Sequence, residues 1–340
     1  MVSLRLVSLV LISAVWLSAC SGQPQQKEHY FTGQTMGTTY NVKFVSSQDI
    51  DALALQQKID QRLIDINQMM STYIADSELS MFNQAPSLTP FTLSPDTAFV
   101  VAEALRLGKM SGNALDVTVG PLVNLWGFGP TKRPETIPSD TQIATAKALS
   151  GLDKLVLDGV VLTKSTDGLY LDLSTIAKGY GVDAIAELLI DRKLNNFLVE
   201  IGGEMRVAGT KLNGETWRIA IEKPVTESRA VQKIISVGDN AVATSGDYRN
   251  YYEDDGIRYS HLIDPNTGYP IQHNTVSATV VHSSSMTADG LATAMMVLSA
   301  KDAQALAEIH DIALLLIVKD DDKFVEYQSP AFTQMVTIIN

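Results

Sequence analysis

Cysteine and basic residues are both scarce in this chain. Cys20 is the single cysteine among 340 residues, and 26 Lys and Arg face 38 Asp and Glu, which gives a formal net charge of −12. Without a second cysteine the chain can form no internal disulfide and no cysteine-based zinc site. An acidic chain without basic runs is a poor nucleic-acid binder. The scarcity of cysteine also means that any chemistry must use oxygen and nitrogen groups. Walker-type and dinucleotide-binding glycine motifs are missing as well.

The first residues have the pattern of a secretory signal. Arg5 precedes an apolar run from Leu6 to Leu17, and small residues lead to Cys20. This run is short for a membrane span, so we expect residues 1–19 to be a cleaved signal peptide. The sequence Leu-Ser-Ala-Cys resembles a bacterial lipobox, in which the cysteine becomes the lipidated first residue; the alternative is a chance cysteine. Residues 20–29 would then be the lipidated Cys20 and a flexible tether, followed by one domain over residues 30–340.

The chain is organised around the stretch Leu171–Gly181, which continues into Val182–Ile190. Apolar residues alternate at its start and then recur at helical spacing, so we expect a strand that passes into a helix. Ser174, Thr175 and Lys178 lie at the junction together with two glycines, which let a ligand approach the backbone. Unpaired N–H groups of a helix N-terminus favour an anion. The junction predicts an anion site, and the alternative is an ordinary helix start capped by Ser or Thr.

A second candidate element is the expected helix within residues 283–298. Asp289 and Thr293 are four residues apart and therefore share one helix face. A carboxylate and a hydroxyl are hard oxygen ligands of the kind that Mg²⁺ accepts together with phosphate oxygens. The alternative is a capping Asp and a buried Thr that bonds its own helix.

Weaker candidates lie along the rest of the chain. Met36 is in a glycine-interrupted opening strand expected over residues 32–44. Tyr73 could stack on a planar ligand, and packing on the neighbouring helix is an equal alternative. Asp116 is a lone carboxylate among apolar residues, which needs a partner or a ligand donor. Residues 244–246 read as a turn with hydroxyls suited to phosphate contacts.

Charged residues also occur where buried strands are expected. Glu200 and Glu204 flank a Gly-Gly pair, and Arg206 follows two residues later. Pairing of Arg206 with a glutamate and a ligand role are equally open. His261 and Asp264 lie near an Asn-Thr-Gly turn and could form an acid/base pair, although a lone histidine is more often structural.

The order of elements indicates the fold class. Runs of several strands separate the helices, which argues against alternating βαβ units. We expect an α+β fold, a single catalytic domain of two packed α/β lobes with antiparallel sheets. The expected helices span residues 50–70, 94–112, 139–151, 182–190, 283–298 and 303–310, and the expected strands include 154–164, 168–173, 197–209, 217–221, 233–237, 312–318 and 324–327.

With these stretches identified, the mature chain resembles the ApbE family of FAD:protein FMN transferases along nearly its whole length. Seven ordered motifs carry the resemblance: Met36-Gly-Thr38, Met70-Ser-Thr-Tyr73, Ala114-Leu-Asp116 with Gly120-Pro121, Leu171–Tyr180, Glu200-Ile-Gly-Gly203, Ser260–Pro265 and Ala288-Asp-Gly-Leu-Ala-Thr293. The resemblance implies an ApbE-like fold with FAD between the lobes. It also implies a Mg²⁺-dependent enzyme that splits FAD, joins FMN to a threonine hydroxyl of an acceptor protein and releases AMP.

The family further implies partners and a location. Its acceptors are subunits of the Nqr and Rnf membrane redox complexes, modified at a Ser/Thr-Gly-Ala-Thr-like segment. The chain would be lipid-anchored on the periplasmic side of a bacterial membrane, with the inner membrane favoured. Two alternatives stay open: hydrolysis of FAD to FMN and AMP, and a non-catalytic lipoprotein that carries FAD.

Site residues follow from the resemblance position by position. Asp289 is implied as metal ligand and proton acceptor, and His261 as a second acid/base candidate. Lys178 would face the phosphates or lie solvated on the helix surface, and Gly290 would loosen the ligand helix. The implied metal ligands are the Ala177 carbonyl, Asp289, Thr293 and, as a further candidate, the Ala292 carbonyl. The implied FAD contacts are Met36, Tyr73, Ala114, Leu115, Asp116, Ser174, Tyr180 and Ile263.

Overall fold

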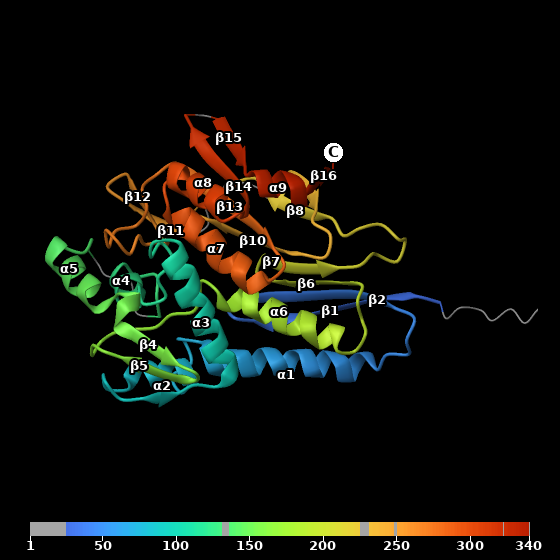
Figure 1. Cartoon of the computed structure of the whole chain (residues 1–340), viewed down its shortest axis with the longest axis horizontal. Helices are drawn as coiled ribbons and strands as arrows, with labels where there is room; N and C mark the ends of the chain where they lie inside the picture. Colours follow the sequence, from blue (N-terminus) through green and yellow to red (C-terminus); the bar gives the residue numbers. More distant parts are fainter. Residues whose placement is uncertain (1–24, 131–135, 225–230, 248–249, 322, 340) are drawn as a thin grey trace, which may run out of the picture.

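The computed structural model describes residues 25–339 except 131–135, 225–230, 248–249 and 322 (Figure 1). The expected signal peptide and Cys20 lie outside the described residues. The first strand begins at Lys27, so the segment expected to be a tether overlaps it. Within the described ranges, no helix combines the length and the apolar character that crossing a membrane would need.

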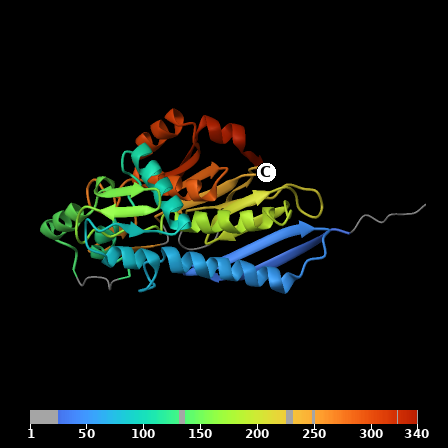
Figure 2. The ribbon, with the colours of Figure 1, turned by 60° about the horizontal axis from the view of Figure 1, so that its bottom comes forward.

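One large sheet of eight strands forms the centre of the molecule (Figures 1 and 2). Every neighbouring pair in it is antiparallel, which confirms the expected α+β class. Its strands, in spatial order, are β1 (Lys27–Thr35), β2 (Thr38–Ser46), β6 (Phe197–Ile201), β7 (Glu204–Ala208), β10 (Ala241–Gly246), β13 (Thr275–His282), β14 (Ala313–Asp320) and β15 (Lys323–Gln328).

Three smaller antiparallel sheets accompany it. They are β16 (Thr337–Ile339) with β9 (Val231–Ser236) and β8 (Ile219–Glu222); β3 (Phe91–Thr92) with β5 (Val161–Lys164) and β4 (Leu155–Asp158); and β11 (Tyr251–Asp254) with β12 (Ile257–Ser260). The first of these packs on one face of the large sheet through Trp217, Val281 and Leu315. Neighbouring residues of β13 and β14 face the opposite way into the helical core, so both strands are almost wholly buried.

The helices are α1 (Ala52–Met70), α2 (Glu78–Gln84), α3 (Pro95–Met110), α4 (Gly120–Leu125), α5 (Asp140–Leu149), α6 (Ala177–Ile190), α7 (Ser285–Val297), α8 (Ala300–Ile309) and α9 (Pro330–Met335), with a 3₁₀ turn at Leu152–Lys154. The expected caps are confirmed: Ser94 accepts a hydrogen bond from the N–H of Thr97, and Ser139 forms a capping box with Gln142. Local sequence therefore determined where these helices start.

Three expected elements differ from the structure. The opening strand is a hairpin, because Met36 and Gly37 turn the chain with φ of 51° and 72°. Residues 168–173 alternate in burial as expected but form no ladder; Tyr170 makes only an isolated bridge to Val119. Residues 244–246 end strand β10 and are not a turn. In each case the outcome depends on a pairing partner, which periodicity alone does not identify.

Helices α6 and α7 pack unusually close to each other at Gly179. A Cβ at this position would lie 2.3 Å from the carbonyl oxygen of Ser285 and 2.8 Å from the Cβ of Asp289. Gly290 does the same for α7 and α3, because a Cβ there would lie 2.6 Å from Leu107. Gly290 thus permits close packing of α7 on α3. This packing role was not part of the expectation that Gly290 loosens α7.

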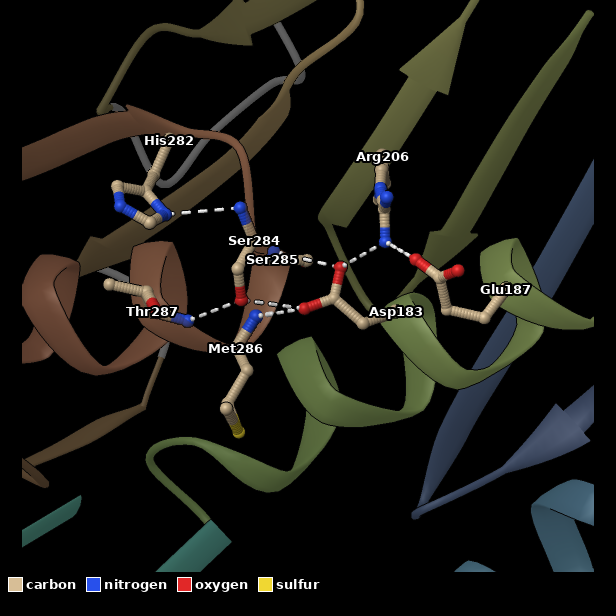
Figure 3. A network of polar contacts seen from close by, with 8 residues as sticks. All are labelled: Asp183, Glu187, Arg206, His282, Ser284, Ser285, Met286 and Thr287. Carbon is tan, nitrogen blue, oxygen red and sulfur yellow. Dashed lines mark hydrogen bonds and ion pairs between the residues drawn. The ribbon is translucent and has the colours of Figure 1, made fainter. Parts of the chain in front are cut away.

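The N-terminus of each of these two helices is bound by a carboxylate of the other. Asp289 of α7 accepts a hydrogen bond from the N–H of Gly179 at 2.9 Å, and α6 has no side-chain cap of its own. Asp183 of α6 accepts from the N–H groups of Ser285 and Met286, both at 3.0 Å, and from the Ser284 hydroxyl (Figure 3). The alternative of a Ser or Thr cap for α6 is therefore wrong, because the carboxylate that binds its N-terminus comes from α7.

Arg206 extends this network to the sheet. Its guanidinium donates to Asp183 at 3.2 Å and to Glu187 at 2.7 Å, both on α6 (Figure 3). Its partners are thus neither Glu200 nor Glu204, and it has a structural pairing instead of a ligand role. Strand β7 is thereby tied to α6.

Replacement of Asp183 by Ala is expected to destabilise the fold by about 2–3 kcal/mol, because a largely buried carboxylate loses three hydrogen bonds from the start of α7 and one from Arg206. Glu187→Ala removes the exposed partner of the same arginine and should cost less than about 1 kcal/mol. Urea unfolding measures both. Equal losses in the free energy of unfolding for the two variants would show that Asp183 acts only through Arg206.

Gly179→Ala should destabilise the protein by about 1–3 kcal/mol, because the new methyl group meets backbone that cannot move aside. Gly181→Ala is the matched control on the same helix. Its methyl group meets the ends of the Met36 and Ile201 side chains at 3.0 and 3.1 Å, which can shift, so its stability should stay within about 1 kcal/mol of wild type. Thermal unfolding of the two variants tests this, and similar losses would contradict the packing argument.

Candidate functional site

A cavity of about 440 Å³ lies where the start of α6 meets α7, β7, the end of β10 and the loop after β12. It brings together residues that are far apart in the sequence. The predicted site residues that line it are Tyr73, Ala114, Leu115, Asp116, Ser174, His261, Ile263, Asp289 and Thr293, and Lys178 lines it as well.

A second cavity of about 470 Å³ adjoins the first. The two share Tyr73, Asp172, Ser174 and Lys178. The second cavity contains two further predicted residues, Met36 and Ala177, and continues along the end of α1.

Tyr180 and Ala292 line neither of these cavities. The Tyr180 hydroxyl accepts a hydrogen bond from Arg62 of α1 at 3.0 Å, and Arg62 also pairs with Asp96 of α3. Through Arg62, Tyr180 therefore connects α6 to α1 and α3. Ala292 is buried within α7, on the same helix as Asp289 and Thr293.

Lys178 lies between two buried carboxylates at the cavity. Its ammonium is 2.7 Å from Oε1 of Glu204 and 3.7 Å from Oδ1 of Asp289. Burial raises the pKa of Asp289, an effect that the ammonium of Lys178 opposes. Burial alone would lower the pKa of Lys178, but the two carboxylates raise it, so the side chain is a cation. Lys178 thus faces the cavity, and the solvated alternative is wrong.

Asp289 and Thr293 fit a metal at this cavity. Both line it one helical turn apart, and one Asp289 oxygen is held by the N–H of Gly179. The described residues contain no cluster of three or more His, Cys, Asp and Glu side chains suited to a metal. The expected Mg²⁺ ligands are one carboxylate, one hydroxyl and main-chain carbonyls, so they need no such cluster; substrate phosphate oxygens and waters complete such a site.

His261 faces the cavity but does not pair with Asp264. Its Nδ1 is 3.0 Å from the Asn250 carbonyl oxygen, whereas Asp264 accepts from the N–H of Asn266 in the turn. Because a carbonyl only accepts, Nδ1 carries the proton and Nε2 is left as an acceptor. Burial lowers the pKa of His261, so the ring is neutral. The proposed His–Asp pair is therefore absent, and His261 stays a base candidate on its own.

Asp116 is paired with Thr118, as a carboxylate in apolar surroundings requires. Its Oδ1 accepts hydrogen bonds from the N–H of Thr118 at 2.7 Å and from the Thr118 hydroxyl at 2.5 Å. Burial raises its pKa nonetheless. Asp116 lines the cavity with a fixed orientation, which suits a group that binds a donor of the ligand.

Two lining residues, Asp172 and Asn250, received no role from the sequence. Asp172 accepts from the N–H of Ser174, and burial raises its pKa. The signal available for Asp172 was its position as the charged residue between two buried leucines, whereas the position of Asn250 depends on loop placement and has no local signal. Thr244 and Ser245, which the sequence singled out for phosphate contacts, also line the first cavity, although they end strand β10 and form no turn.

Known proteins resemble this chain along nearly its whole length. The ApbE family model matches residues 36–316. A protein of Vibrio cholerae serotype O1 named FAD:protein FMN transferase is 51% identical over 325 residues, which cover 95% of this chain and 97% of the relative. A protein of Haemophilus influenzae with the same name is 47% identical and covers 97% and 98%.

Solved structures agree with the sequence comparison. The flavin transferase ApbE from Vibrio cholerae superposes with a TM-score of 0.86 at 51% identity, covering 91% of this chain and 99% of that one. The apo form of the flavinyl transferase ApbE from Pseudomonas stutzeri gives 0.85 at 41% identity, covering 92% and 97%. The expected resemblance and fold are confirmed: this chain is an enzyme and belongs to the ApbE family.

Proposed function

We propose that this protein transfers FMN from FAD to a threonine hydroxyl of an acceptor protein, with Mg²⁺ bound and with release of AMP. The observation that carries the proposal is that Asp289 and Thr293 line the first cavity together with Lys178, which also lines the second cavity. The names of the relatives, FAD:protein FMN transferase, support the substrate and the reaction class.

The two cavities suit the shape of FAD. This molecule has two ring systems joined through a diphosphate, and the cavities share Ser174 and Lys178 where a central anionic group would lie. Their volumes of about 440 and 470 Å³ are in the usual range for small-molecule sites. Tyr73, which is exposed at both cavities, is placed to cover a ring system.

The cavity residues have distinct tasks in this reaction. Asp289 and Thr293, with the carbonyls of Ala177 and Ala292 as further candidates, would hold Mg²⁺. The bound ion supplies charge neutralisation at the diphosphate oxygens. Lys178 places a second positive charge at the same group, and the N-terminus of α6 is directed toward the cavity.

The transfer forms one P–O bond and breaks another. The threonine oxygen of the acceptor attacks the phosphorus on the FMN side, the bond from that phosphorus to the bridging oxygen breaks, and AMP leaves with that oxygen. The hydroxyl proton must pass to a base, and the neutral His261, with its free Nε2, and Asp289 are the two candidates at the cavity. Phosphoryl transfer otherwise needs mainly alignment and charge neutralisation.

The acceptors in this proposal are subunits of the Nqr and Rnf complexes with a Ser/Thr-Gly-Ala-Thr-like segment. Lipidation at Cys20 would place the enzyme on the periplasmic side of the membrane, beside such acceptors. FAD hydrolysis uses the same residues with water as the nucleophile. A carrier without chemistry is disfavoured because simple FAD storage needs no metal ion at the diphosphate.

Asp289→Asn should abolish FMN transfer, because the amide binds Mg²⁺ far more weakly than the carboxylate. The measurement is intact mass of an acceptor fragment after incubation with FAD and Mg²⁺. Wild type should add one FMN less water, and EDTA should prevent the gain. Asp65→Asn, on the exposed face of α1, is the matched control and should leave transfer intact. AMP release without a mass gain would establish hydrolysis, and bound FAD with neither product would establish a carrier.

His261→Gln should lower kcat by roughly 10²- to 10⁴-fold if the imidazole takes the proton. The KM for FAD should change little, because the amide occupies nearly the same volume at the cavity wall. Steady-state kinetics at saturating Mg²⁺ separate the two constants. An unchanged kcat would assign the base role to Asp289.

A further inference from the structure

Glu204 is a buried carboxylate at the active cavity with an unusual set of contacts. It is the first residue of β7, directly after the Gly202–Gly203 turn, and its residue surface is 4% exposed. Its Oε1 lies 2.7 Å from the ammonium of Lys178, whereas its buried Oε2 has no hydrogen-bond partner. A buried carboxylate is costly unless it is paired, so the contact with Lys178 is what balances it.

Lys178 is shared unequally between its two carboxylates. The 2.7 Å contact with Glu204 is a charge-assisted hydrogen bond, whereas 3.7 Å to Asp289 is beyond hydrogen-bond length. The backbone favours this arrangement. Gly202 lies beside the aliphatic part of the lysine, and a Cβ there would be 3.4 Å from the Lys178 Cδ and 2.8 Å from Thr38. The turn therefore leaves room for Lys178 to reach Glu204.

We propose that Glu204 is a positioning residue that holds the Lys178 ammonium away from Asp289. The Asp289 carboxylate then remains available to a divalent cation, and Lys178 remains directed at the diphosphate. This inference rests on the proposed function, because it concerns the metal ligand and the anionic group of that site.

Removal of the Glu204 charge changes the partner of Lys178. A buried ammonium needs an anion, and Asp289 is the other carboxylate within reach. A direct Lys178–Asp289 ion pair would engage the oxygen that is free of the α6 N-terminus, since the other oxygen is bound to Gly179. Lysine and the cation would then compete for the same oxygen.

The test is a Mg²⁺ titration of the full mature chain with FAD present. Binding is measured by calorimetry and by the rise in Tm. Glu204→Gln should weaken Mg²⁺ binding about tenfold, which corresponds to about 1.4 kcal/mol. At saturating Mg²⁺ its kcat should return to within about threefold of wild type. Glu200→Gln is the matched control: Glu200 belongs to the same hairpin but binds Asn41 and Gly203, and it lies outside this cavity. It should leave Mg²⁺ binding unchanged.

The double variant Glu204→Gln with Lys178→Met distinguishes positioning from simple structural damage. With the competing ammonium removed, Mg²⁺ affinity should recover to near the wild-type value, although transfer stays slow. Failure of this recovery would overturn the proposal. Glu204→Asp keeps the charge but shortens the side chain, and it provides a second measurement if Glu204→Gln does not fold. Its Mg²⁺ affinity should lie between that of wild type and the tenfold weaker affinity expected for Glu204→Gln.

The outcomes separate this inference from the proposed function. If wild type binds Mg²⁺ and Glu204→Gln binds it equally well, the role of Glu204 is refuted and the transferase proposal stands. If wild type itself binds no Mg²⁺ while FMN transfer proceeds, the metal site is refuted and the role of Glu204 with it.

Discussion

The exchange of carboxylates between α6 and α7 is the interaction on which the site depends. The side chain of Asp289 on α7 binds the N-terminus of α6, and the side chain of Asp183 on α6 binds the N-terminus of α7. Each bond fixes the position of the other helix, and Gly179 lets the two backbones approach closely enough for both. The candidate metal ligand is therefore also a structural cap. One oxygen of Asp289 is oriented by the fold, and the other is left for the cavity.

This arrangement concentrates charge in a place that water reaches poorly. Two buried carboxylates share one ammonium, so the group of three carries an excess negative charge when both carboxylates are ionised. Such an excess is unfavourable without a further cation. The same excess would disfavour a lone phosphate, which is itself an anion. A cation bound together with a diphosphate resolves both problems, because it balances the carboxylates and the phosphate oxygens at once. In the proposed function, electrostatics would thus link metal binding to substrate binding.

Sequence reasoning succeeded where the information is local. Asp289 and Thr293 share a face because they are four residues apart, and Ser139 with Gln142 caps a helix because the two are three apart. It failed where a partner comes from another element. The partners of Arg206 lie on α6, and Lys178 faces Glu204 across the β6–β7 turn. No periodicity relates these pairs, since only the packing of a helix on a sheet brings them together. Resemblance of ordered motifs supplied other long-range information, because it grouped Tyr73, Asp116 and Asp289, which line one cavity.

The motifs themselves mix two kinds of residue. Ser174 and Lys178 face the cavities, whereas Tyr180, in the same stretch, binds Arg62 and so fastens α6 to α1 and α3. A side chain that orients α6 determines where Gly179 presents its N–H, and hence where Asp289 is held. Residues without contact to the cavity therefore contribute to its geometry. The motif around the start of α6 thus combines ligand-facing groups with the support that keeps them in place.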